Sequence, residues 1–260
     1  ARRIAHVGAA EAGLLTSPAR PIVPLARRYG APLSGLVAPG NPLVGVLLPY
    51  TPVHHLLLRP VPVRAGPARP APDTLVMTSG NLTDEPIAHE DADARRRLGA
   101  LADAWLTHDR PIHVPCDDSV VRVVDGRELP VRRSRGYAPL PVALPAGLAG
   151  APPVLAVGGE LKNTSCLTSG ARAWLSQHVG DMGSVETLAA FERTAAQLGT
   201  VHDVVPEVVA ADGHPGYHTR RWAEGRAGDP VLVQHHHAHA AALMADRKST
   251  RLNSSHSSIS

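Results

Sequence analysis

The stretch that decides the fold is Val233-Gln234-His235-His236-His237-Ala238-His239-Ala240-Ala241-Ala242. It follows the apolar, strand-like run Val231-Leu232-Val233 and leads into alanines, which favour helix. If a helix begins here, His235 and His239 are four positions apart and share one face. Two imidazoles on one helical turn can hold a borderline metal ion. Histidine runs also occur as tags and as non-specific metal tracts, but a tag rarely lies between a strand and a helix.

Length and composition set the broad class. The 260 residues allow two domains with a sizeable core. No apolar run approaches the roughly 20 residues of a membrane span, and the start has no secretory signal pattern, so we expect no membrane association. Cys116 and Cys166 form no CxxC motif or disulfide framework, and we interpret both as structural. A reducing cytoplasm is the expected location.

The last residues differ from the rest in composition. Residues 247–260 turn abruptly to Ser and Asn, and we interpret them as a non-native tail outside the fold. They contain three of the 26 basic residues and no acidic residue, so the rest of the chain is balanced against its 23 acidic residues. The basic charge therefore comes from the tail, and nucleic acid is not an expected partner.

A Pro/Ala/Gly-rich segment, residues 139–153, predicts a linker between two domains, residues 1–140 and 152–246. In the first domain we expect a buried strand at 75–77 leading into a loop at 78–81, a helix over 91–105, and a hairpin turned at Asp125-Gly126. In the second we expect a strand–glycine turn–strand opening and then alternating strands and helices, which predicts an α/β domain. The expected strands there are 154–157, 164–167, 171–176 and 208–212, with helices over 185–198 and 217–225.

Several loops carry groups suited to anion binding. Arg20 lies beside a rigid proline turn, and Arg binds phosphate or carboxylate bidentately. Ser79 and Asn81 lie in the loop after the predicted strand, which suits an anion nest. Ser134 and Arg135 belong to a charged cluster flanking the hairpin. Each of these also has an ordinary interpretation as a solvated loop residue.

In the second half, a glycine turn carries Lys162 and Asn163 at its tip and could approach phosphates through backbone N–H groups, although it lacks the P-loop pattern. Asp212 ends a predicted strand, where α/β folds place ligands, and we expect it to act on substrate or behind a metal ligand. His235 and His239 are the predicted metal ligands. His236 and His237 point elsewhere on a helical wheel: we expect His236 to be packed or substrate-facing and His237 to be structural. No catalytic residue is assigned from the sequence.

Taken together, these stretches resemble the carbamoyltransferases of [NiFe]-hydrogenase maturation, the HypF type, collinearly over about residues 11–246. The resemblance rests on residues 17–23, LPYTP (48–52), MTSGNLTDEPI (77–87), DRPIHVPCDDSVVR (109–122), RRSRGYAP (132–139), GGELKNT (158–164), SQHVGD (176–181), residues 212–217 and QHHHAH (234–239).

The resemblance implies a fold that is α+β and then α/β. A YrdC-like twisted open-sheet domain, truncated at its start, precedes a truncated actin/Hsp70-like (ribonuclease H-like) domain. It also implies that the third protein ligand of the metal is an aspartate beyond residue 260, and that the isolated fragment binds metal weakly.

The resemblance further implies an ATP-dependent carbamoyl transfer. Carbamate from carbamoyl phosphate is adenylated with ATP and Mg in the YrdC-like domain. The carbamoyl group then passes to the C-terminal cysteine of the partner protein HypE. Arg20, Ser79 and Asn81, with Ser134 and Arg135 at the edge of the pocket, would hold nucleotide and carbamate, and zinc or iron would sit at the histidines.

Two alternatives stay open. One is the related tRNA threonylcarbamoylation machinery, which uses a YrdC-like synthase and a homologous transferase. The fusion of both modules and the absence of net positive charge outside the tail argue against it. The other is a non-catalytic metal-binding interaction module.

Overall fold

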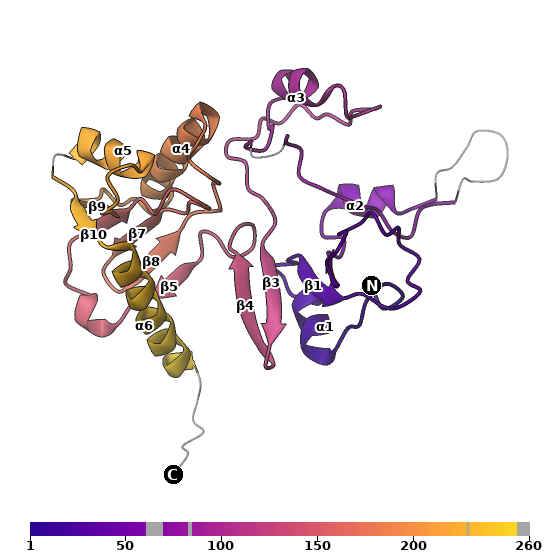
Figure 1. The fold of residues 1–260 in the computed structure, drawn as a ribbon, viewed down its shortest axis with the longest axis horizontal. Helices are drawn as coiled ribbons and strands as arrows, with labels where there is room; N and C mark the ends of the chain where they lie inside the picture. The colour runs from indigo at the N-terminus through magenta and orange to yellow at the C-terminus, as the bar shows by residue number, and fades with distance from the viewer. Residues whose placement is uncertain (61–69, 83–84, 228, 254–260) are drawn as a thin grey trace, which may run out of the picture. The chain divides into compact units, whose positions relative to one another are not determined.

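The computed structural model describes residues 1–60, 70–82, 85–227 and 229–253 (Figure 1). The chain folds as two compact units that are interleaved along the sequence: residues 1–79 with 118–136, and residues 80–117 with 137 onward. The domain limits suggested by the sequence, 1–140 and 152–246, stay a prediction. Among the described residues, every helix is too short or too polar to span a bilayer.

The first unit is a small α+β structure. Its two antiparallel strand pairs, β1–β2 and β3–β4, are linked by a parallel bridge between Ile22 and Val120. Its buried apolar side chains include Leu14, Leu15 and Val23. The elements are α1 (Ala9–Thr16), β1 (Val23–Ala26), β2 (Leu43–Val46), α2 (Pro52–Leu57), β3 (Val120–Val124) and β4 (Arg127–Arg132).

The β3–β4 hairpin confirms the turn predicted at Asp125-Gly126. Both residues have positive φ, 50° and 73°, as a type I′ turn requires. This turn matches the right-handed twist of the two strands, and it pairs Val124 with Arg127.

The strand predicted at residues 75–77 is wrong. No described strand pairs with this segment, and Leu75, Val76 and Met77 are 41%, 71% and 59% exposed. An apolar run becomes a buried strand only where another strand supplies hydrogen bonds and another layer covers it. Neither is present around these residues in the described part of the chain.

The second unit is built on one six-stranded mixed sheet of order β10-β9-β6-β7-β8-β5. Strands β6, β9 and β10 are parallel, whereas β7, β8 and β5 continue the sheet in antiparallel fashion. The strands are β5 (Pro141–Ala143), β6 (Val154–Ala156), β7 (Cys166–Ser169), β8 (Arg172–Leu175), β9 (Val208–Asp212) and β10 (Val231–Val233).

Helices α4 and α5 lie together on one side of this sheet (Figure 1). The core between them includes Leu155, Leu167, Phe191, Leu198 and Ala223. Ser184 caps the start of α4 by accepting a hydrogen bond from the Thr187 amide at 3.1 Å. The helices of this unit are α3 (Asp91–Leu98), the 3-10 helix η1 (Ala146–Leu148), α4 (Val185–His202), α5 (His218–Ala227) and α6 (His235–Asn253).

Three further expectations need correction. Helix α3 ends at Leu98 rather than at 105, because Gly99 follows and glycine disfavours helix. The predicted linker contains β5, which pairs with β8, and η1, so much of it is ordered structure. Helix α6 continues through Asn253, so the change of composition at 247 does not end the helix, whereas residues 254–260 lie outside the described residues.

Candidate functional site

The carboxyl ends of three parallel strands bring together most of the groups expected in the second half. β6 is followed by Gly158-Gly159, β9 ends on Asp212, and β10 is followed by His235, the first residue of α6. Parallel strands end at the same edge of a sheet, where α/β folds bind ligands. The register pairs Val233 with Asp212 across β10 and β9, which sets the start of α6 beside the carboxylate.

Asp212 and His235 form the central contact of this edge. Oδ2 of Asp212 lies 2.6 Å from Nδ1 of His235, and Oδ1 accepts a hydrogen bond from the His214 amide at 2.9 Å. The Asp212 side chain is only 8% exposed. Burial alone would raise its pKa, but the hydrogen bonds from His235 and His214 and the charges of both histidines outweigh burial and hold the pKa below its ordinary value.

His239 lies one helical turn beyond His235. The two Nε2 atoms are 3.1 Å apart, and the rings meet edge to face. A carboxylate at Nδ1 of His235 favours the tautomer with the proton on that nitrogen, so Nε2 of His235 keeps its lone pair. His236 and His237 are exposed on the same helix.

These residues fit two ligands of a metal ion. Two nitrogens on one tetrahedral zinc lie about 3.3 Å apart when each Zn–N bond is about 2.0–2.1 Å, close to the observed 3.1 Å. A carboxylate behind one imidazole is the usual device for orienting a metal-bound histidine. Among the described residues, no group of three or more His, Cys, Asp or Glu side chains is arranged to hold a metal, so the two histidines provide a partial coordination sphere.

The glycine turn after β6 packs closely against this edge. Gly158 has a φ of +71°, and a Cβ there would lie 2.6 Å from the Thr164 carbonyl oxygen. A Cβ on Gly159 would lie 3.8 Å from Cε1 of His235 and 3.9 Å from the ring of Tyr217. Asn163 is buried and holds the turn by donating to the carbonyls of Val157 and Gly159, each at 2.8 Å. Lys162 is exposed at the tip, with a φ of 50° and its amide bonded to Asp181 at 2.6 Å.

The pair of Glu160 and His218 was not predicted from the sequence. The Glu160 carboxylate accepts the backbone N–H of His218 at 2.8 Å and lies 2.5 Å from its Nδ1. It thereby caps α5, whose first residue is His218, and ties this helix to the glycine turn. The two residues lie 58 positions apart. No local pattern announces such a pair, although both belong to or adjoin quoted motifs.

In the first unit, Arg135 is the centre of a polar cluster with Asp118 and Tyr50. Its Nε donates to Asp118 at 2.8 Å, and its two terminal nitrogens donate to the carbonyls of Ala19 at 3.1 Å and Arg20 at 2.8 Å. The guanidinium lies 3.5 Å from the ring centroid of Tyr50, whose hydroxyl donates to Asp118 at 3.0 Å. Burial and the neighbouring Asp118 raise the pKa of Tyr50, against the opposing effect of Arg135.

This cluster brings together three of the predicted binding residues. Arg20 has a φ of 44°, an uncommon backbone conformation that Arg135 supports through the Arg20 carbonyl. Ser134 is fully buried, and its amide donates to the Ser119 hydroxyl at 2.7 Å. Ser119 in turn donates to the Arg135 carbonyl at 2.9 Å, which ties the residue before β3 to the segment after β4 at the cluster.

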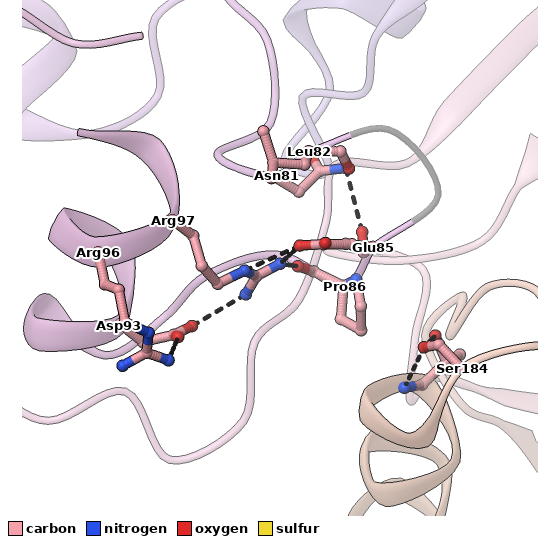
Figure 2. Close-up of polar contacts among 9 residues, drawn as sticks. Asn81, Leu82, Glu85, Pro86, Asp93, Arg96, Arg97 and Ser184 are labelled. Carbon is pink, nitrogen blue, oxygen red and sulfur yellow. Dashed lines mark hydrogen bonds and ion pairs between the residues drawn. The ribbon is translucent and has the colours of Figure 1, made fainter. Parts of the chain in front are cut away.

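The loop residues Ser79 and Asn81 fall in different units. Ser79 is exposed at the end of a segment of the first unit, and Asn81 belongs to the second. Asn81 turns its amide into its own loop, donating to the carbonyls of Leu82 at 2.8 Å and Glu85 at 3.1 Å (Figure 2). The convergence of Arg20, Ser79 and Asn81 on one pocket therefore stays a prediction.

Two family models match the chain. Residues 1–134 match the Sua5/YciO/YrdC model, described as telomere recombination, and residues 149–246 match the HypF Kae1-like domain. Fold and site therefore place the protein in a class in which a YrdC-like domain is joined to a Kae1-like domain of the actin/Hsp70-like type.

Individual relatives agree with both halves. Carbamoyltransferase HypF of Rhizobium leguminosarum bv. viciae is 48% identical over 95% of this chain and 32% of its own length. Carbamoyltransferase HypF2 of Cupriavidus necator is 45% identical over 94% of this chain and 31% of its own. A crystal structure of full-length HypF in the phosphate- and nucleotide-bound form is 36% identical with a TM-score of 0.86, over 95% of this chain and 37% of that one. The crystal structure of T. kodakarensis HypF is 34% identical with a TM-score of 0.83, over 95% of this chain and 31% of that one.

The chain belongs to the HypF family. It spans about a third of the length of the curated relatives it matches.

Proposed function

We propose that this chain carries the adenylation centre and part of the transfer centre of a carbamoyltransferase that matures [NiFe] hydrogenase. Water hydrolyses carbamoyl phosphate to carbamate and phosphate, and the carbamate then reacts with ATP to give carbamoyl-AMP and pyrophosphate. The carbamoyl group is then transferred to the C-terminal cysteine thiol of HypE, giving a thiocarboxamide and AMP. The observation that carries the proposal is a YrdC-like domain followed by a Kae1-like domain with Asp212, His235 and His239 at its strand ends.

In the adenylation centre, the chain acts by positioning and charge rather than by covalent chemistry. The proposed binding groups are Arg20, Ser79 and Asn81, with Ser134 and Arg135 beside them and Mg accompanying ATP. Arg135 already donates to Asp118 and to the carbonyls of Ala19 and Arg20. Its contribution is therefore to hold the backbone of Arg20 while the Arg20 guanidinium neutralises phosphate.

In the transfer centre, His235 and His239 would hold zinc or iron, which supplies Lewis-acid polarisation of the carbamoyl group when bound. Asp212 keeps the proton at Nδ1 of His235 and so directs the Nε2 lone pair toward His239. Lys162, exposed on the turn beside His235, would position the acyl-adenylate, whereas the buried Asn163 would act by holding the turn in place.

ATP–pyrophosphate exchange tests the proposal. The chain is incubated with ATP, Mg and labelled pyrophosphate, with either carbamoyl phosphate or threonine plus bicarbonate. We expect label to enter ATP only with carbamoyl phosphate. Exchange only with threonine and bicarbonate would favour tRNA threonylcarbamoylation. No exchange in either mixture would contradict adenylation by this chain and favour the metal-binding interaction module.

A further inference from the structure

Two successive glycines follow β6, and their surroundings differ. At Gly158 a φ of +71° disfavours any side chain, and a Cβ would lie 2.6 Å from the Thr164 carbonyl oxygen. At Gly159 the backbone lies outside the left-handed region, and among the described residues a Cβ would meet only atoms at ordinary van der Waals distances. Backbone conformation and packing therefore account for Gly158, but neither requires a glycine at position 159.

The atoms that a Cβ on Gly159 would meet belong to two aromatic rings. They are Cε1 of His235 at 3.8 Å and Cε2 of Tyr217 at 3.9 Å. In an imidazole Cε1 is bonded to Nε2, which in His235 faces His239 and is the proposed metal-binding atom. The space over Gly159 therefore lies beside the metal-binding edge of His235. We call the space bounded by Gly159, His235 and Tyr217 the glycine slot.

The walls and the floor of the glycine slot are held in place. The carboxylate at Nδ1 fixes the His235 ring, and His214 stacks on Tyr217 with ring centroids 4.4 Å apart and an interplanar angle of 24°. The floor is fixed because Asn163 donates to the Gly159 carbonyl at 2.8 Å. A group placed in the slot would therefore meet ordered surfaces, which resist displacement.

The surroundings of the glycine slot suit a flat, uncharged group. Both wall atoms are ring carbons, which pack well against planar groups. The Asp212 carboxylate lies 2.6 Å from the other nitrogen of the same imidazole and disfavours a second negative charge nearby. In the described part of the chain no acceptor takes the Gly159 N–H, which leaves a main-chain donor for a carbonyl oxygen. These features favour a small amide-like group over a phosphate.

We propose that Gly159 is a specificity-determining residue of the transfer centre, whose missing side chain leaves room for the planar carbamoyl group beside His235. The proposal rests on the function proposed above and deepens it by giving the acyl group, rather than the nucleotide, its place. Proteins use glycine in this way where a ligand approaches the backbone closely. One methyl group at this position would fill the glycine slot and exclude the acyl group without disturbing the fold.

Hydroxyurea tests the proposal, because it joins a carbamoyl group to an oxygen donor that can bind a metal. The chain is loaded with Co(II), and the visible absorption of the ion is followed as hydroxyurea is added. We expect Gly159→Ala to weaken hydroxyurea binding about tenfold or more, the discrimination that one methyl group gives in a pocket. Gly183→Ala is the matched control and should bind as the unchanged chain does. Gly183 lies in the same unit without a positive φ, and a Cβ there meets nothing within 4 Å.

Two further measurements separate the glycine slot from general damage. Co(II) affinity and the midpoint of urea unfolding should not fall in Gly159→Ala, because the added Cβ brings neither overlap nor backbone strain. Lower Co(II) affinity in Gly159→Ala, equal weakening of hydroxyurea binding in the two alanine variants, or no weakening in either would overturn the proposal. So would a Co(II) spectrum of the unsubstituted chain that does not respond to hydroxyurea.

Pyrophosphate exchange distinguishes this proposal from the proposed function. Gly159 is not among the groups proposed for adenylation, so Gly159→Ala should exchange label at the unchanged rate. Absence of exchange in the unsubstituted chain would overturn adenylation by this chain, whereas the hydroxyurea titration would still decide the role of Gly159. Loss of exchange in Gly159→Ala alone would contradict the assignment of this residue to the transfer centre.

Discussion

Two kinds of region hold functional side chains by different means. One is the edge of the sheet that carries Asp212, His235 and His239, called here the histidine edge. The other is the loops anchored by Arg135 and Arg97. At the histidine edge, Asp212 ends β9 and His235 comes just after β10. The two strands are adjacent and parallel, and their register sets the two residues side by side. In the loops, single guanidinium groups hold the chain instead: Arg135 donates to the carbonyls of Ala19 and Arg20, and Arg97 contacts the Glu85 carboxylate and donates to the Pro86 carbonyl.

The difference predicts different responses to substitution. Sites on strands and helices are positioned by many shared main-chain bonds, whereas loop sites depend on the few side chains that anchor them. At the strand ends, removal of a side chain should remove its own contacts and leave its neighbours in place. In the loops, removal of one arginine should release several residues at once.

The largest effect should follow Gly158→Ala, which disturbs the backbone of the turn beside His235. The added Cβ would lie 2.6 Å from the Thr164 carbonyl and 2.9 Å from the Asn163 amide, at a φ of +71°. We expect the free energy of unfolding to fall by about 3 kcal/mol, from steric overlap and backbone strain together. Tryptophan fluorescence in a urea titration reports it, because Trp105, Trp174 and Trp222 all lie in the second unit.

Gly170→Ala is the matched control for Gly158→Ala. Gly170 also has a positive φ, +56°, but a Cβ there meets nothing within 4 Å. Its cost should be about 1 kcal/mol, from backbone conformation alone. Equal losses in the two variants would mean that the turn after β6 is not closely packed.

Metal binding should come next in size. Zinc affinity of the chain should fall about a hundredfold in His235→Ala and in His239→Ala, because each leaves a single imidazole. His236→Ala and His237→Ala, on other faces of α6, should bind zinc as the unchanged chain does. Competition against a chromogenic zinc chelator measures all four. Retained affinity without His235 or His239, and loss without His236 or His237, would reverse the ligand assignment.

Arg135→Ala tests the loop side of the comparison. It removes the ion pair with Asp118, two hydrogen bonds to carbonyls and the stacking on Tyr50. We expect the first unit to lose about 2 kcal/mol of stability. Hydrogen exchange of the Ile22 and Val121 amides, which donate to the carbonyls of Ser119 and Ile22 where the two strand pairs meet, measures it.

Tyr50→Phe is the milder partner of that substitution, because it deletes only the hydroxyl that donates to Asp118. A loss of about 1 kcal/mol is expected. If Arg135→Ala cost no more than Tyr50→Phe, the guanidinium would not be the anchor of the cluster.

The smallest effect concerns pH. His202 ends α4 and stacks on Trp174 at a centroid distance of 4.4 Å, and burial lowers its pKa. The unfolded chain, with a histidine pKa of about 6.5, therefore binds this proton more readily than the folded chain does. The contribution of this residue to the free energy of unfolding is fully present above a pH of about 6.5 and declines as the pH falls below that value. His202→Phe should flatten the pH dependence of urea unfolding in that range, and an unchanged slope would contradict the assignment.

Regular elements with strong local signals were predictable from the sequence. Strand β9 has the predicted bounds, the β3–β4 hairpin turns at Asp125-Gly126, and α6 begins at His235. Each follows from neighbouring residues: apolar β-branched runs, a turn dipeptide that tolerates positive φ, and alanines that favour helix. The spacing of His235 and His239 on one face follows from helix geometry alone.

Only the tertiary structure decided which distant groups meet. Three contacts join residues whose separation in the chain carries no periodic signal. They are the pairing of Glu160 with His218, the stacking of Arg135 on Tyr50 and the ion pair of Arg97 with Glu85. The exposed segment 75–77 shows the same limit, because burial of an apolar run depends on partners elsewhere in the chain. The sequence by itself therefore determined the local elements and the two facing histidines, since backbone sterics and helix periodicity act over a few residues. The fold determined their partners, since hydrogen bonds and burial act through space.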